Sequence, residues 1–161
     1  MKKLFIIPII IFLFSCSKDK VNPDVGPITI EFDNVFTEDL DLTIDYNVSN
    51  LQLKRDDGAV YTDGLNSHHV SEADEGSQEI SLKDVPAGNY TQVSFKIESL
   101  KVSGSLDYTN ASATVVLAMP GTGAPVRAEH EPEAHLIFNM NTLKDGGDVS
   151  SAFVVDHVHA N

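Results

Sequence analysis

The side chains best suited to chemistry in this sequence are its six histidines. Imidazole nitrogen binds copper, zinc and nickel, and histidine is the commonest metal ligand in proteins. His157 and His159 are separated by one residue near the C-terminal end of the chain. Because alternate residues of a β-strand point to the same face, both rings would project together from a strand. The pair therefore predicts a metal site, whereas Asp156 would point to the opposite face.

Two further histidines precede this pair. His135 starts an alternating apolar run, and we expect it to face His157 or His159 if the two strands are neighbours. His130 lies among glutamates in a stretch that Pro132 interrupts, which indicates a loop that leads into the strand of His135.

The remaining histidines, His68 and His69, are adjacent in the chain. Adjacent residues of a strand point to opposite sides, so a solvated polar face is the alternative to metal binding here. For His157 and His159 the alternatives are the same solvated face or a frayed C-terminal tail. The sequence thus predicts metal ligands at these positions: His135, His157, His159, His130 and His69.

Signatures of the common enzyme classes are missing from the chain. It has no glycine-rich phosphate-binding loop, no nucleophilic serine elbow and no His-Glu-x-x-His motif. We therefore expect no catalytic residues and no enzymatic activity. Cys16 is the single cysteine, which excludes an intrachain disulfide and a cysteine-rich structural zinc site.

The N-terminus has the pattern of an export signal. Lys2 and Lys3 precede an apolar run that ends at Phe14, and Ser15 and Cys16 follow. The run is about half of the roughly 20 apolar residues that a transmembrane helix needs. Leu13–Cys16 resembles a lipobox, and the residues after it resemble those of Bacteroidetes lipoproteins. Residues 1–15 are thus predicted to be a lipoprotein signal peptide, with Cys16 as the site of lipidation.

Charge and composition restrict the partners. The segment 16–27 is polar and proline-containing, as expected of a flexible tether between the lipid and the domain. The net charge is −13, and nucleic acid is not an expected partner because phosphate binding requires clustered lysine and arginine. A cation or a basic surface fits better, with simple solubility as the alternative. We expect an outer membrane lipoprotein, on its periplasmic or its cell-surface side, whose acylated cysteine contacts the bilayer.

From Ile28 onward, apolar and polar residues alternate with a period of two, and no segment has a convincing helical stripe. A slip in the alternation at Ser49-Asn50 predicts a bulge or a strand boundary. The most apolar run, residues 114–119, predicts a central strand. Strands are also expected over residues 135–141 and 153–159. About eight or nine such strands predict an all-β fold, an immunoglobulin-like antiparallel β-sandwich over residues 28–161.

Several stretches occur together in the order typical of one family. They are Ile28–Phe32, Asn47–Lys54 with the turn at Asp57-Gly58, His69–Asp74, Ile80–Phe95 with its Val-Pro-Ala-Gly-Asn-Tyr turn, and His135–Leu143. Together they resemble the copper-binding MbnP-like domain of bacterial exported proteins, over most of residues 28–143.

The resemblance implies an exported β-sandwich that binds copper. It also implies, for some members, a di-haem peroxidase-like partner protein. Typical members have a longer, tryptophan-containing insert after the strand that ends near Phe95, whereas this chain has no tryptophan. A copper site that depends on an oxidised tryptophan therefore cannot form here.

Two functions fit the sequence. The first is a lipid-anchored, exported β-sandwich protein that binds a metal ion, with copper as the expected cofactor. The alternative is a surface adhesion or protein-interaction lipoprotein module without a metal, for which a sandwich with an acidic surface is sufficient.

Overall fold

The computed structural model describes residues 24–35, 43–64, 66–72, 77–103 and 108–160. The predicted signal peptide, Cys16 and most of the predicted tether lie outside these residues. The described strands are β1 (Val25–Val35), β2 (Thr43–Arg55), β3 (Val60–Thr62), β4 (Ser67–Glu72), β5 (Gln78–Pro86), β6 (Gly88–Ser103), β7 (Tyr108–Ala118), β8 (Ala124–Val126), β9 (Glu133–Asn139) and β10 (Phe153–His159). A short helix α1 (Met140–Lys144) and a 3-10 turn η1 (Val149–Ala152) separate the last two strands.

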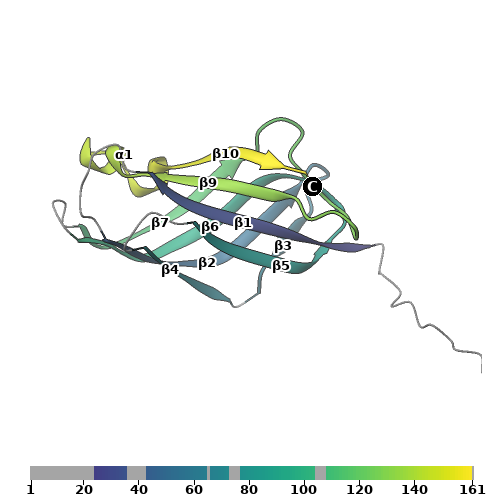
Figure 1. Ribbon diagram of the computed structural model, residues 1–161, viewed down its shortest axis with the longest axis horizontal. Coiled ribbons are helices and arrows are strands. Elements are labelled where there is room, and N and C mark those ends of the chain that lie inside the picture. Colours follow the sequence, from purple (N-terminus) through teal and green to yellow (C-terminus); the bar gives the residue numbers. More distant parts are fainter. Residues whose placement is uncertain (1–23, 36–42, 65, 73–76, 104–107, 161) are drawn as a thin grey trace, which may run out of the picture.

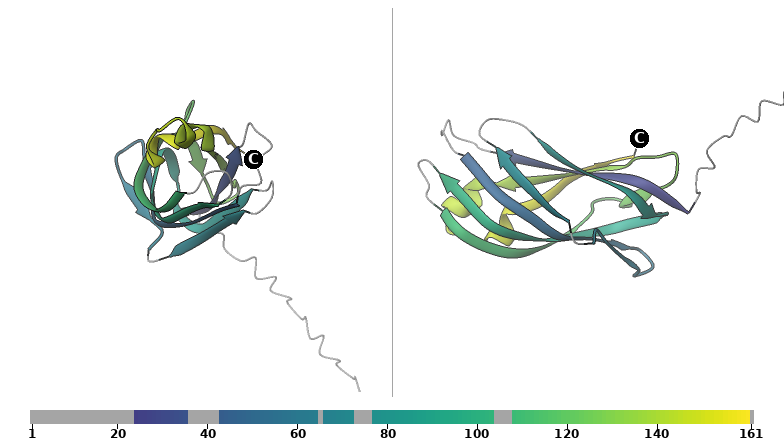
Figure 2. Two further views of the ribbon diagram at one scale, coloured as in Figure 1. Left: turned by 90° about the vertical axis from the view of Figure 1, so that its left-hand side faces the viewer. Right: turned by 90° about the horizontal axis from the view of Figure 1, so that it is seen from below.

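The strands form two sheets that pack face to face, which confirms the predicted all-β sandwich (Figures 1 and 2). One sheet has the order β10-β9-β1-β5. The other has the order β3-β2-β6-β7, with β4 paired to β2 and β8 paired to β6. In Figure 1 the first sheet lies in front, and the strands of the second cross behind it.

One strand pair departs from the predicted antiparallel arrangement: β1 and β9 are parallel. The chain enters β9 from the loop after β8, and this loop runs beside the start of β1. The amide of Thr29 donates a hydrogen bond to the carbonyl of Pro132 at 3.0 Å. Because β9 starts where β1 starts, the two strands run in the same direction.

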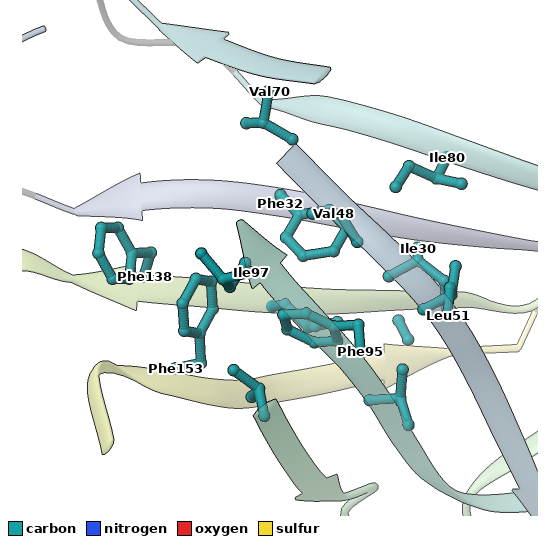
Figure 3. Packing of buried hydrophobic residues seen from close by; sticks show 14 of the residues in the cluster. Ile30, Phe32, Val48, Leu51, Val70, Ile80, Phe95, Ile97, Phe138 and Phe153 are labelled. Carbon is teal, nitrogen blue, oxygen red and sulfur yellow. The ribbon is translucent and has the colours of Figure 1, made fainter. Parts of the chain in front are cut away.

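The core lies between the sheets and follows the alternation seen in the sequence. Phe95 of β6 contacts Phe32 of β1 and Phe153 of β10 edge-on, with ring centroids 5.4 Å apart in both pairs (Figure 3). Phe138 of β9 stacks on Phe153 at 4.5 Å. These rings join both sheets, so the inward faces of β9 and β10 are fixed by packing, and their other residues must face outward.

The slip in the alternation at Ser49-Asn50 is a bulge within one continuous strand. The pairing of β2 with β6 shifts between Ser49 and Gln52, and Asn50 has a φ of +51°. Further along, the turn before β6 is closed by Tyr90, whose hydroxyl donates a hydrogen bond to the carbonyl of Pro86 at 2.8 Å.

Two elements differ from the sequence-based expectation. The strand predicted to be central over residues 114–119 belongs to β7, the last strand in its sheet order, and Val116 on it is 59% exposed. This segment has aliphatic residues on both faces, which is the sequence pattern of a buried strand. The strand of His135 ends at Asn139, whose side chain caps α1 by accepting a hydrogen bond from the amide of Asn141. No helix in the described part of the chain is long and apolar enough to cross a bilayer.

Candidate metal centre

Three of the predicted metal ligands meet on the outer face of the sheet β10-β9-β1-β5. On β9, Ala134 and Leu136 are fully buried between the sheets, so His135 faces outward. The antiparallel register pairs His157 of β10 with His135. The condition for His135 to face His157 is thus met, because β9 and β10 are neighbouring strands that run side by side (Figure 1).

A β-bulge in β10 sets the direction of His157 and His159. Phe153 pairs with Phe138 in the core, and the register then shifts between Val155 and His157. Strict alternation from the buried Phe153 would turn His157 towards the core. The additional residue in the bulge, Asp156, reverses this phase, so both histidines emerge on the outer face.

The three imidazoles are close enough to share an ion. One ligand atom from each of His135, His157 and His159 lies within 4.8 Å of the others. The ring centroids of His135 and His157 are 4.0 Å apart, and those of His157 and His159 are 4.4 Å apart. Nitrogens bound to one tetrahedral ion at about 2.0–2.1 Å are roughly 3.3–3.4 Å apart. The rings of His135 and His157 are stacked, with 21° between their planes, so binding of one ion by all three nitrogens requires these rings to rotate.

Two carboxylates contact the rings of His135 and His157 at their Nδ1 atoms. His135 Nδ1 lies 2.7 Å from Glu31 Oε2 on β1, and His157 Nδ1 lies 2.6 Å from Asp156 Oδ2. An ionised carboxylate only accepts hydrogen bonds, so each Nδ1 carries the proton and donates it. The Nε2 atoms of His135 and His157 are then left as acceptors. Metal-binding histidines commonly have such an orienting carboxylate.

Glu31 is a buried carboxylate, with only 9% of its surface exposed. Burial is the largest influence on its pKa and raises it. Hydrogen bonds from Ser77 and Glu133, together with the nearby His135 and His157, outweigh burial, so the pKa of Glu31 lies below its usual range. Glu31 is therefore ionised and able to orient His135.

The pKa of Glu133 is shifted in the opposite direction from that of Glu31. Its pKa is raised, first by the hydrogen bond that it shares with Glu31 and second by burial. Its Oε1 lies 3.3 Å from His135 Nε2. Glu31, Glu133 and His135 form a second group whose ligand atoms lie within 4.8 Å of one another.

An acidic pocket of about 230 Å³ adjoins this group, lined by Thr29, Glu79, Ser81, Glu131 and Glu133. The hydroxyl of Thr29 donates to Glu131 Oε1 at 3.1 Å and lies 3.2 Å from the hydroxyl of Ser81. The two groups of potential ligands and this pocket make the outer face of the sheet strongly acidic around the histidines.

The structure does not bring His69 and His130 into either group. His69 lies on β4 in the other sheet, with its Nδ1 3.2 Å from Asn47 Oδ1. His130 is exposed in the loop before β9, where it forms an isolated bridge with Arg127. The neighbouring His68 pairs with Asp63 at 2.8 Å.

One known protein family is similar to part of this chain. A model of the MbnP family matches residues 25–98. This segment is therefore similar to the MbnP family. The match covers β1 to β5 and most of β6. Glu31, on β1, therefore lies within the matched segment. The three clustered histidines lie beyond the matched segment, and the resemblance of residues 135–143 is not part of the match.

No match was found among curated proteins or among solved structures. The MbnP match and the two groups of ligand atoms point to a metal-binding role.

Spacing predicted a shared face for His157 and His159, and contact with His135 if their strands were neighbours, but the carboxylates were missed. Glu31 reaches His135 only through the parallel pairing of β1 with β9, for which the sequence has no local signal. Asp156 was expected on the opposite face from the histidines. Its contact with His157 arises from the bulge. A signal did exist, because the core residues Phe153 and Val155 and the site residues His157 and His159 share one alternation phase.

Proposed function

We propose that this protein is an exported, lipid-anchored, non-enzymatic metal-binding protein that holds copper as Cu(II) at His135, His157 and His159. The observation that supports the proposal best is the convergence of three imidazoles from two neighbouring strands within 4.8 Å. A nitrogen site without sulfur favours Cu(II), which binds such ligands more strongly than other divalent first-row metals.

The donor set argues against a site for Cu(I). Thiolate and thioether ligands favour that ion. The methionines of the described residues, Met119 and Met140, are buried in the core. Imidazole nitrogens and carboxylate oxygens surround the site instead, and the acidic surface around them favours a cation.

The protein itself contributes orientation. Glu31 holds His135 and Asp156 holds His157, each through Nδ1, so that the Nε2 atoms are directed to the ion. His159 is 5.6 Å from His135 between ring centroids and completes the set. Acylation at Cys16 would keep this site at the outer membrane, on the periplasmic or the cell-surface side.

Equilibrium dialysis of the detergent-solubilised full chain against Cu(II) tests the binding. The proposal predicts one tightly bound ion per chain. The double variant H157A/H159A should lose it, and the matched double variant H68A/H69A should keep it. A wild type that binds no copper, or equal loss in both variants, would contradict the proposal and leave the metal-free interaction module as the function.

The anchor has its own test. Palmitate labelling in the native host should mark the wild type, and Cys16→Ala should abolish the label. An unlabelled wild type would contradict lipid anchoring without affecting the metal site.

A further inference from the structure

Glu133 lies on the side of His135 from which the proposed ion would approach. Glu31 occupies Nδ1 of His135, so Nε2 is the nitrogen that binds the ion. Glu133 Oε1 lies 3.3 Å from that Nε2. Two atoms on one tetrahedral ion, bound at about 2.0–2.2 Å, are roughly 3.3–3.5 Å apart. The spacing of these two atoms is therefore already that of two ligands of the same metal.

The strand register places Glu133 beside the third histidine as well. Glu133 on β9 pairs directly with His159 on β10, just as His135 pairs with His157. The four residues form two adjacent cross-strand pairs on one face of the sheet. Because alternate residues of a strand share a face, the four side chains project from the same side of the sheet.

We propose that Glu133 is the fourth ligand of this metal site, so that the protein encloses a divalent ion with three imidazoles and one carboxylate. This inference rests on the proposed function. In the structure one ligand atom of Glu133 lies within 4.8 Å of ligand atoms of Glu31 and His135, so its side chain already turns towards the cluster.

The number of protein ligands determines whether the ion is open to a substrate. Four protein ligands leave no open position on a tetrahedral ion, and closed sites are typical of ions that are held rather than used in catalysis. A hard carboxylate oxygen also favours a divalent ion over Cu(I). The site would thus enclose Zn(II) completely and would fill the four equatorial positions of a tetragonal Cu(II) ion.

Glu133→Gln tests the proposal, with Glu131→Gln as a matched control. Glu131 lies two residues away, lines the same acidic pocket and loses the same charge. The readouts are the Zn(II) affinity of the full chain and the electron paramagnetic resonance spectrum of its Cu(II) form. Thermal unfolding of both metal-free variants checks the fold.

Glu133→Gln should weaken Zn(II) binding by more than about 100-fold, beyond the roughly 10–100-fold cost of losing a residue that only orients a ligand. It should also change the copper spectrum, because an oxygen ligand is lost. Glu131→Gln should stay within about threefold of the wild type, as expected for a screened charge.

Glu133→Asp provides a second variant, because it keeps the charge but shortens the side chain. It should weaken binding nearly as much as Glu133→Gln. If the wild type binds the ion and both Glu133 variants resemble Glu131→Gln, Glu133 is not a ligand and the proposed function stands. A wild type without bound ion overturns both.

Discussion

His135 Nδ1 and Glu31 Oε2 lie 2.7 Å apart across β9 and β1, the one parallel strand pair of the two described sheets. His157 lies on the opposite side of His135, so the imidazole is held between a buried carboxylate and a second ring. This arrangement fixes which nitrogen of His135 remains available for an ion. It also connects the segment matched by the MbnP model to the histidines beyond it.

Removing the charge of Glu31 should weaken metal binding without removing a ligand. Glu31→Gln is expected to lower the Cu(II) affinity roughly 10–100-fold, because His135 loses the carboxylate that orients it. Competition titration measures the affinity. The matched control is Glu79→Gln, since Glu79 pairs with Glu31 across β1 and β5 and is exposed. Equal effects of both variants would show that only net charge matters.

The bulge in β10 makes a counter-intuitive prediction. Deleting Asp156 removes the bulge. Val155 then faces the core in regular alternation, and His157 and His159 still emerge on the outer face. The deletion should retain metal binding, weakened about 10-fold by loss of the contact between Asp156 and His157.

Inserting one alanine after Asp156 should do the opposite and abolish binding, because regular pairing then places Asp156 opposite His135 and moves His157 to the position opposite Glu133. Metal content after dialysis distinguishes the two variants. Loss of binding in the deletion and retention in the insertion would show that β10 does not pair with β9 through a bulge at Asp156.

The hydroxyl of Tyr90 should contribute to stability but not to metal binding. Tyr90→Phe removes the hydrogen bond to Pro86, and we expect it to lower the free energy of unfolding by about 0.5–1.5 kcal/mol. Urea denaturation measures this change. Tyr61→Phe is the control, because Tyr61 is only partly buried, and its effect should stay within about 0.5 kcal/mol. A change in copper affinity in Tyr90→Phe would contradict the separation of fold and site.

Gly123 is required for a close backbone approach. A Cβ at this position would lie 2.3 Å from the carbonyl oxygen of Tyr90, and the residue has a φ of +81°. Gly121 has a φ of +64° but open space around it. Alanine at Gly121 should therefore cost about 1–2 kcal/mol from the left-handed backbone alone.

Alanine at Gly123 should cost clearly more than alanine at Gly121, because the clash is with backbone. The two melting temperatures provide the comparison. Equal destabilisation would show that the backbone near Tyr90 moves aside.

The fold was largely predictable from alternation. The final strand, Phe153–His159, was predicted with the bounds that the structure has, and the slip at Ser49-Asn50 is a bulge. Alternation reports which face a residue occupies, so it predicted a shared face for His157 and His159. It carries no information about which strands are neighbours. The edge position of β7 and the parallel pairing of β1 were therefore not predicted.

The site was predictable only in part, for the same reason. The cluster of His135, His157 and His159 follows from local spacing and one antiparallel pairing. Its carboxylate support depends on the contact of Glu31 with His135 across a pairing of strands that are distant in the sequence. His69 was a plausible ligand by residue type, but β4 belongs to the other sheet.

The most direct test of the metal site is anomalous diffraction at the copper absorption edge, from crystals of the protein grown with Cu(II). The account predicts one strong peak on the outer face of the sheet, within bonding distance of the Nε2 atoms of His135 and His157 and of a ring nitrogen of His159. A peak at any other place, or no peak at these three rings, would contradict it.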